Sequence, residues 1–260
     1  AGDVHATAAA FTSVEQLQRL NAIVDEGNAL FHGVYHGMLT KQVRNNVGYD
    51  EFCAMLGGTA VDAARYPQRS GDPTAVYAAA AEALPLFEQV LVELVGRVAD
   101  AEPRMRVAPL KHVFRVLQKH AMRVDGGAPT HFETACDIVR GSIVCGSMGE
   151  LLRVLGALLT LQAEGRIVIV RIKDRFSHPT SAGWADAMIN FVCLGGSGAA
   201  AGHVCELQLV HATMLKARKE FGGHNAYAAF REAAELLEYA VRGILTEQLD
   251  AAVDALEGAV

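Results

Sequence analysis

Polar and apolar residues alternate with a period of two along three stretches in the second half of the chain. Because successive side chains of a β-strand point to opposite faces, each stretch is predicted to be a strand with one polar face. Apolar residues would be expected on buried strand faces, so these polar positions are candidate functional residues. They are Arg171, Lys173 and Arg175 on the first stretch, Trp184, Asp186 and Asn190 on the second, and Glu206 and Gln208 on the third.

The same patterns predict how the strands are connected. A β-branched run at residues 138–145 is typical of a buried strand. An apolar helix at 148–163 and a second strand at 166–173 follow it, so we expect a βαβ unit with parallel pairing of its two strands. A third strand is expected at 184–194 and a fourth at 203–210. The glycine-rich segment between them, residues 195–202, predicts a flexible hairpin connection and antiparallel pairing.

Apolar residues recur with helical spacing in the rest of the chain. A long helix capped by Ser13 is predicted at residues 13–46, and Gly27 marks a point at which it could break. Residues 65–74 form the clearest loop. Further helices are predicted at residues 49–56, 75–101, 110–122, 214–220 and 224–256. The fold class is therefore α+β: a mixed β-sheet of about four to five strands flanked by helices, preceded by a helical N-terminal region at residues 1–105, with the second domain at 106–250.

Charge, hydropathy and cysteine content limit which partners and which compartment we expect. The 260 residues include 23 basic and 29 acidic residues, and the formal charge of −6 gives no general attraction to nucleic acid or to an anionic membrane. The longest apolar run, residues 154–170, is interrupted by Gln162, Glu164 and Arg166, so no membrane span is expected there. The five cysteines form no CxxC pair and stand in apolar surroundings. Buried reduced thiols are therefore expected, which indicates a reducing compartment, normally the cytoplasm.

Two carboxylates are the candidate metal ligands. Asp137 stands directly before the first predicted strand, and Glu206 lies within the fourth. Carboxylates on neighbouring strands can share a Mg²⁺ that also binds phosphate oxygens. Asp137 is equally placed to cap the structure that follows it. His32 and His36 lie one helical turn apart, but no third ligand is evident, so surface or packing histidines are favoured.

Cations suited to phosphate lie near both carboxylates. Lys173 and Arg175 belong to the second predicted strand, and a positive stripe at i, i+4 spacing is predicted on the helix at 110–122: Lys111, Arg115, Lys119 and Arg123. On its own this stripe is also what a solvated helix face looks like. Trp184 offers a π-face on which a base can stack, and Glu206 suits a general base. Together these residues favour nucleotidyl or pyrophosphoryl transfer.

The ordered motifs DIVRGSIV, RIKDRFSHPTSAGWADAMINFV, CELQLV and HNAY resemble the synthetase domain of the RelA/SpoT alarmone synthetases over roughly residues 110–231. The resemblance implies a nucleotidyltransferase-type fold and transfer of pyrophosphate from ATP to the ribose 3′-hydroxyl of GDP or GTP. It further implies that Asp137 binds Mg²⁺, that Glu206 assists the metal or the proton transfer beside Gln208, and that the remaining site residues contact substrate: Arg115, Lys119, Lys173, Arg175, Trp184, Asp186, Asn190 and His224.

The sequence departs from the family at two cationic positions. Ser142 stands on the first strand where relatives usually carry Arg, and Leu209 and Val210 follow Gln208 where another Arg is usual. Arg140, two residues before Ser142, would share its strand face and is the expected substitute for the first arginine. No residue near Gln208 replaces the second. No hydrolase domain with a metal-binding His-Asp motif is evident in the first half of the chain.

Three interpretations follow from these motifs. The first is a Mg²⁺-dependent pyrophosphokinase that acts on ATP and a purine nucleotide acceptor; tRNA is a less favoured acceptor, and a homo-oligomer is left open. The second is a catalytically degenerate module of the same fold that binds a nucleotide or a protein. The third treats Glu206 and Gln208 as the solvated face of an edge strand and Trp184 as a core aromatic.

Overall fold

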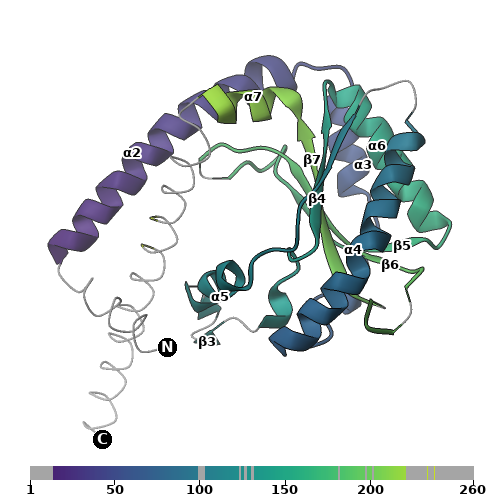
Figure 1. The fold of residues 1–260 in the computed structure, drawn as a ribbon. Helices are drawn as coiled ribbons and strands as arrows, with labels where there is room; N and C mark the ends of the chain where they lie inside the picture. The colour runs from purple at the N-terminus through teal and green to yellow at the C-terminus, as the bar shows by residue number, and fades with distance from the viewer. Residues whose placement is uncertain are drawn as a thin grey trace, which may run out of the picture.

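A five-stranded mixed sheet lies at the centre of the protein (Figure 1). The computed structural model describes residues 14–98, 103–122, 124–125, 128–129, 132–180, 182–196, 198–200, 202–220, 233 and 237. Within these residues the strand order across the sheet is β1-β4-β7-β6-β5. The strands are β1 (Arg104–Val107), β4 (Arg140–Cys145), β5 (Ile167–Asp174), β6 (Ala187–Cys193) and β7 (Val204–His211), and a separate pair is formed by β2 (Val124–Asp125) and β3 (Ala128–Pro129).

Helices surround this sheet, which confirms the predicted α+β class. The α-helices are α2 (Val14–Met38), α3 (Tyr49–Gly57), α4 (Pro73–Gly96), α5 (Val113–Met122), α6 (Met148–Ala163) and α7 (Ala212–Glu220). Short 3-10 or π turns are η1 (Leu39–Val43), η2 (Ala63–Arg65), η3 (Phe132–Thr134) and η4 (Gly198–Ala200). The predicted helix at 224–256 and the predicted cap Ser13 lie outside the described residues.

The pairing of strands differs from the prediction at one point. β4 pairs in parallel with β7, whereas β6 pairs antiparallel with both β5 and β7. The predicted parallel pairing of the two strands around α6 is therefore wrong, because β7 and β6 lie between β4 and β5. The antiparallel hairpin of β6 and β7 was predicted correctly. Periodicity assigns residues to strand faces, but it does not say which strands become neighbours.

The edge strand β1 was not predicted. Its four residues alternate charged and apolar side chains, RMRV, and it pairs antiparallel with β4. A run this short that begins directly after Pro103 falls below the length at which alternation is informative. The expected domain boundary between residues 105 and 106 falls inside this strand.

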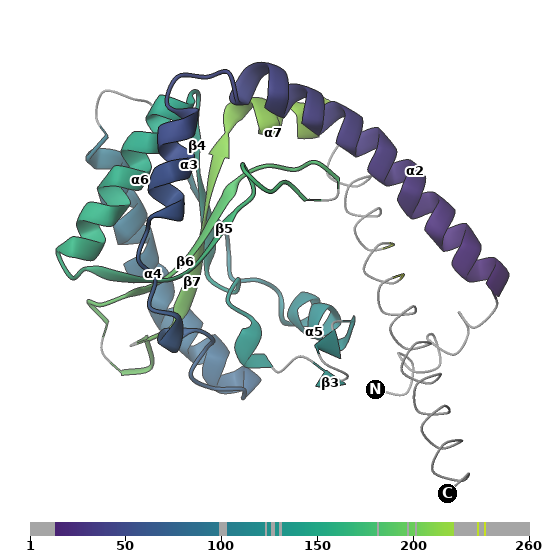
Figure 2. The same ribbon diagram turned by 180° about the vertical axis from the view of Figure 1, so that it is seen from behind.

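Helices α3, α4 and α6 cover one face of the sheet (Figures 1 and 2). Gly141 of β4 identifies that face, because a Cβ added there would lie 2.9 Å from both Phe87 and Leu91 of α4. The ring of Phe87 also stacks on Phe191 of β6, with centroids 5.6 Å apart. One hydrophobic core thus joins helices from the first hundred residues to the strands of the second half of the chain.

Helix α4 begins at a conventional cap. Asp72 precedes it and accepts a hydrogen bond from the Ala75 amide at 2.8 Å, with Pro73 in the first turn. Among the described residues α4 alone is long and apolar enough to cross a membrane, with 24 residues and a mean hydropathy of 1.3 over its most apolar window. A core helix meets the same test, and α4 buries Phe87 and Leu91 against the sheet.

Helix α2 runs unbroken through Gly27 and continues into the π turn η1. A glycine within a helix costs about 1 kcal/mol relative to alanine, which weakens a helix without ending it. The break expected near Gly27 is therefore wrong. Helix α2 lies beside α7, which follows β7 directly (Figure 2). All five cysteines are unpaired and four of them are buried, as the sequence indicated.

Candidate functional site

The sheet face opposite α4 carries the polar residues. Directly paired residues on neighbouring strands share a face, and Gly141 points to α4, so its neighbours Arg140 and Ser142 point to the other side. The register then continues across the sheet to define a polar face. Its members are Arg106 of β1, Arg140 and Ser142 of β4, Glu206 and Gln208 of β7, Met188 and Asn190 of β6, and Arg171 and Lys173 of β5.

Glu206 lies in the middle of this polar face. Arg140 is its partner on one side and Asn190 its partner on the other. The carboxylate accepts a hydrogen bond from Gln208 Nε2 at 2.9 Å, and its residue is 8% exposed. The sequence prediction that Glu206 and Gln208 share a face is thus confirmed. Since β7 is flanked on both sides, the interpretation of Glu206 on an edge strand is wrong.

Asn190 has a fixed orientation. Its Nδ2 donates to the carbonyl oxygens of Cys136 and Cys205, both at 3.3 Å. Only the amide nitrogen can donate to two carbonyls, so Oδ1 must be the atom that faces elsewhere. Asn190 therefore ties the segment that precedes β4 to β7 and positions the ladder in which Glu206 lies.

Arg171 is held on the polar face by Tyr66. A register shift between Ile169 and Arg171 marks a bulge in β5, after which Arg171 pairs with Asn190. The Arg171 guanidinium donates to Tyr66 Oη and lies 4.9 Å from the centre of that ring. Burial raises the pKa of the adjacent Cys136 thiol to about 12, so this thiol is neutral at neutral pH and does not itself balance the guanidinium charge.

Asp137 lies in the turn before β4, where it forms an ion pair with Lys111 Nζ at 2.5 Å. Both side chains are largely buried, with 15% and 17% exposed. Arg140 also donates to the Asp137 carbonyl at 3.2 Å. The sequence predicted Lys111 in a positive stripe on the helix at 110–122. That prediction is wrong for Lys111, because it precedes α5. The chain before α5 pairs with the residues before β4, and this pairing turns Lys111 towards the carboxylate.

Asp137 and Glu206, the two predicted Mg²⁺ ligands, lie on neighbouring segments of the chain. The amide of Glu206 donates to the carbonyl of Val139, two residues after Asp137, so the carboxylates come from adjoining segments. Among the residues that the structure describes, no group of three or more His, Cys, Asp and Glu side chains is placed to hold a metal ion. Mg²⁺ is commonly held by one or two carboxylates together with phosphate oxygens and water. Two carboxylates are the donors that such a shared site uses.

Arg175 and Asp186 form a second ion pair, at 3.1 Å, one row beyond Lys173. Asp186 is 1% exposed, and the amide of Arg175 also donates to the Asp186 carbonyl. The predicted strand faces that grouped these residues with Lys173 and Asn190 are consistent with this pairing. Because one oxygen of Asp186 is used by Arg175, the pair fixes the direction of the guanidinium beside the polar face.

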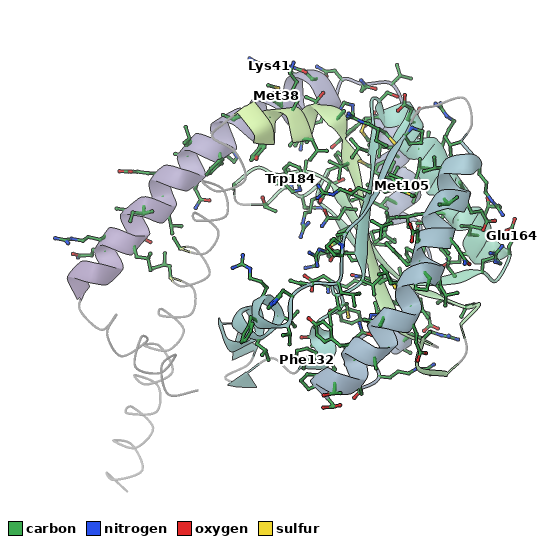
Figure 3. All side chains as sticks on the ribbon, in the orientation of Figure 1. Met38, Lys41, Met105, Phe132, Glu164 and Trp184 are labelled. Atoms are coloured by element: carbon green, nitrogen blue, oxygen red, sulfur yellow. The ribbon has the colours of Figure 1, made fainter. Side chains whose placement is uncertain are left out.

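Trp184 differs from its predicted position. It precedes β6 instead of belonging to it, is 7% exposed, and makes an edge contact with Tyr35 of α2, with centroids 5.5 Å apart. Figure 3 places it on the inner side of α2 and α7. Gly183 allows this packing, since a Cβ there would lie 3.1 Å from Tyr35. Trp184 is therefore buried, as the core-aromatic interpretation expected, and not exposed. Stacking of a base on its ring stays a prediction.

Four of the predicted residues have not yet been placed: Arg115, Lys119, Arg123 and His224. Arg115 is an exposed residue of α5, and the backbone of Lys119 lies on the same helix, whereas its side chain is not among those described. Arg123 and His224 lie outside the described residues. Arg106 and Tyr66 were not predicted as site residues. Arg171 was predicted on a polar strand face, but without a role. The alternation RMRV was the one signal that could have revealed Arg106.

The chain was compared with known proteins. No protein-family model and no curated protein matches it. Small alarmone synthetase 2 from Bacillus subtilis is 16% identical, with 71% of this chain and 97% of that chain covered and a TM-score of 0.45. Small alarmone synthetase 1 from Bacillus subtilis, bound to its product pppGpp, is 17% identical, with 72% and 94% covered and a TM-score of 0.41. A GTP pyrophosphokinase family protein from Streptococcus pneumoniae is 13% identical, with 68% and 92% covered and a TM-score of 0.36.

Proposed function

We propose that the protein is a Mg²⁺-dependent pyrophosphokinase that transfers pyrophosphate from ATP to the 3′-hydroxyl of a guanine or adenine nucleotide. The observation that carries this proposal is the row Arg140, Glu206, Asn190 and Arg171 across the polar face. A carboxylate between two arginine-bearing strands has the charges that a hydroxyl nucleophile and a polyphosphate require.

In the proposed reaction Glu206 accepts the proton of the 3′-hydroxyl as that oxygen attacks the β-phosphorus of ATP. The bond from O3′ to the β-phosphorus forms. The bond from the β-phosphorus to the oxygen that bridges to the α-phosphorus breaks, and AMP leaves with that oxygen. Gln208 holds one Glu206 oxygen at 2.9 Å and so fixes the direction of the carboxylate.

Arginine and lysine side chains of the sheet would bind the phosphates. Arg140 of β4 and Arg171 of β5 form the two ends of the row, and Lys173 lies on the same face of β5 two residues after Arg171. Arg106 of β1 is the direct partner of Ser142, so it supplies a cation beside the position at which relatives carry arginine. The edge strand β1 thus offers a cation in place of the arginine that β4 lacks at position 142.

Asp137 and Glu206 would hold Mg²⁺ together with the phosphates of ATP. When bound, the ion supplies charge neutralisation at the phosphate oxygens. Lys111, which contacts Asp137 in the structure, would then turn to a phosphate, since its flexible stem allows it to exchange one anionic partner for another.

The test is release of AMP from ATP in the presence of Mg²⁺ and GDP, GTP, ADP or tRNA, each in a separate reaction. We expect AMP with a purine nucleotide acceptor and none with Glu206→Gln. Glu51→Gln, which changes an exposed carboxylate on α3, is the matched control and should leave the rate unchanged. The proposal is abandoned if the wild-type chain releases no AMP with any acceptor.

A second candidate is a nucleotide-binding module without catalysis. The Lys111 to Asp137 ion pair favours it, because this pair occupies a carboxylate that catalysis would need for the metal. Binding of ATP by calorimetry, combined with absence of AMP, would establish this alternative. Five unpaired cysteines support a reducing compartment such as the cytoplasm for either function, and gel filtration would report the oligomeric state.

A further inference from the structure

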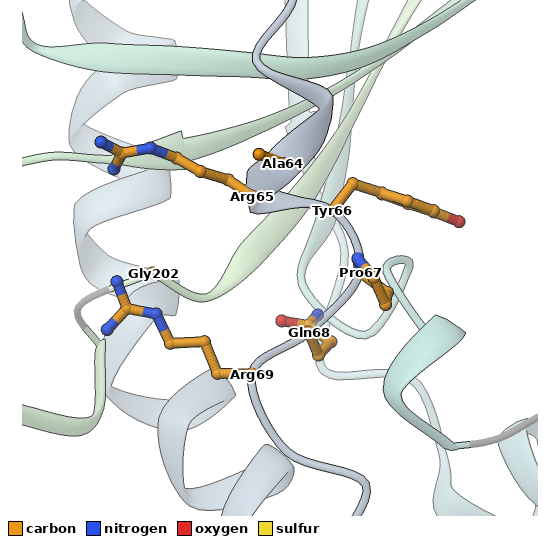
Figure 4. Close-up of a pocket in the computed structure, with 7 residues that line it drawn as sticks. All are labelled: Ala64, Arg65, Tyr66, Pro67, Gln68, Arg69 and Gly202. Atoms are coloured by element: carbon orange, nitrogen blue, oxygen red, sulfur yellow. The ribbon is translucent and has the colours of Figure 1, made fainter.

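A cavity of about 330 Å³ lies under the loop that connects η2 to α4 (Figure 4). We call it the loop cavity. Its volume is at the lower end of the range for small-molecule sites. The lining residues are Ala64, Arg65, Tyr66, Pro67, Gln68, Arg69 and Gly202. None of them belongs to the polar face, and none is acidic.

Gln68 fixes the loop to the sheet. Its side chain donates to the carbonyls of Val204 and Ala135, at 3.0 and 3.3 Å, and accepts from the Val204 amide at 2.9 Å. Its own amide donates to the Glu133 carbonyl at 2.8 Å. Gln68 is 5% exposed, so these bonds are shielded from water. The arginines near Gln68 in sequence therefore project from a rigid support.

Arg69 is the central cation of the loop cavity. Its guanidinium lies against Gly202, where an added Cβ would overlap it. Gly202 also has a φ of +88°, a conformation that other residues rarely adopt. Within the described part of the chain Arg69 has no hydrogen-bonded or ion-paired partner, although a guanidinium carries five donors. Arg69 is exposed, and its donors remain available beside Gly202.

Arg65 adds a second positive charge on the same side of the loop. Figure 4 shows Arg65 and Arg69 extending to one side while Tyr66 extends to the other. Arg65 uses its Nε to contact Asp62 at 3.0 Å, which leaves its terminal nitrogens for another acceptor. Arg69 and Arg65, the latter paired with the Asp62 carboxylate, lie beside a cavity whose lining residues include no carboxylate. They form a local basic site in a chain whose formal charge is −6.

We propose that the loop cavity binds a small phosphate-bearing molecule, held by Arg69 and Arg65, at a site separate from the polar face. Planar guanidinium groups match phosphate oxygens in pairs. Tyr66 connects the two sites, because the loop that lines the cavity also places the Tyr66 ring against Arg171. A molecule bound in the cavity would therefore contact the loop whose Tyr66 positions Arg171 on the polar face.

The test is an NMR titration of the ¹⁵N-labelled full chain with inorganic phosphate, pyrophosphate or ADP. We expect saturable shifts of the Gly202 and Gln68 amides that are independent of the shifts at Gln208, which report on the polar face. Arg69→Gln should weaken pyrophosphate binding at Gly202 by about tenfold or more, as expected for loss of a charged partner. Arg153→Gln, on the exposed side of α6, is the matched control and should leave these shifts unchanged.

The three ligands separate recognition of phosphate alone from recognition of a nucleotide. Gly202→Ala provides a second variant, since it displaces the guanidinium of Arg69 without removing its charge; it should also weaken binding. Gly202 and Gln68 amides that do not shift in the wild-type chain would overturn the proposal, even where a variant proves unstable. An Arg69→Gln chain that binds pyrophosphate at Gly202 as the wild type does would overturn it as well.

Discussion

Arg106 of β1 and Ser142 of β4 are direct partners across an antiparallel ladder, so their side chains lie on the same face of the sheet. Ser142 continues the row to Gln208, Met188 and Lys173. β4 has no cation at position 142, but its neighbour β1, an edge strand of four residues, supplies one. This relationship turns one of the two departures from the pattern of the resembling family into a prediction.

Arg106→Gln should lower kcat/KM for ATP by roughly 10- to 100-fold, the loss expected for one charge-assisted contact to a phosphate. Arg106 is exposed, so the free energy of unfolding should change little. The double variant Arg106→Gln with Ser142→Arg should recover part of the lost rate, because the new guanidinium starts from the neighbouring position on the same face. Steady-state AMP release measures all three chains. Arg153→Gln is the control, and equal rates for it and Arg106→Gln would contradict the prediction.

Periodicity could predict most of the sheet faces in this chain. Glu206 with Gln208, and Arg171 with Lys173, were placed correctly because alternation is a local property of a strand. Strand order was not predictable in the same way, since it depends on how α6 crosses the sheet and which edges remain for later strands. The wrong parallel pairing of β4 with β5 follows from this limit, whereas β1 was missed because it has only four residues.

Trp184 shows why a motif does not fix the environment of its residue. Its sequence position suggested a base platform, but α2 lies over the segment and receives the indole in an edge contact with Tyr35. The long helix was predicted, whereas its packing site was not, because the contact joins residues about 150 positions apart. Local patterns carry no information on such a distant partner.

Trp184→Ala should lower the free energy of unfolding by about 3–5 kcal/mol, as expected for a large buried side chain. Trp184→Leu and Trp184→Phe separate packing from base stacking. Both keep a large apolar group, but only phenylalanine offers a π-face. We expect equal AMP release from these two variants. A rate that falls with leucine and survives with phenylalanine would restore the base-platform role. Urea unfolding and the AMP assay are the two measurements.

Gly141→Ala should destabilise the protein by about 1–3 kcal/mol, the usual cost of an additional methyl group in a packed core. The new Cβ would lie 2.9 Å from Phe87, Leu91 and the Arg106 carbonyl, and the last is backbone and cannot rotate away. Gly156→Ala on α6 is the matched control, because nothing lies within 4 Å of its added Cβ. That helix position should gain about 0.5–1 kcal/mol. Thermal unfolding of both variants checks the opposite signs, and a stable Gly141→Ala chain would contradict the packing of α4 on β4.

Stability should decrease as the pH falls from about 6.5 to 4, and His203 should account for part of this loss. His203 is 4% exposed, and burial lowers its pKa to about 4 because the charged imidazolium is disfavoured. An unfolded histidine has a pKa of about 6.5. Between these values the unfolded chain binds more protons, so the free energy of unfolding falls with pH, by about 3 kcal/mol in total at pH 4.

Urea unfolding at pH 7, 6 and 5 tests the role of His203. His203→Gln should show a shallower decrease than the wild type, because glutamine takes up no proton on unfolding. Some decrease should remain, since burial also lowers the pKa of His211. His178→Gln, which changes an exposed histidine, should follow the wild-type curve. Parallel curves for His203→Gln and the wild type would show that His203 is protonated in the folded state, and that burial does not keep it neutral.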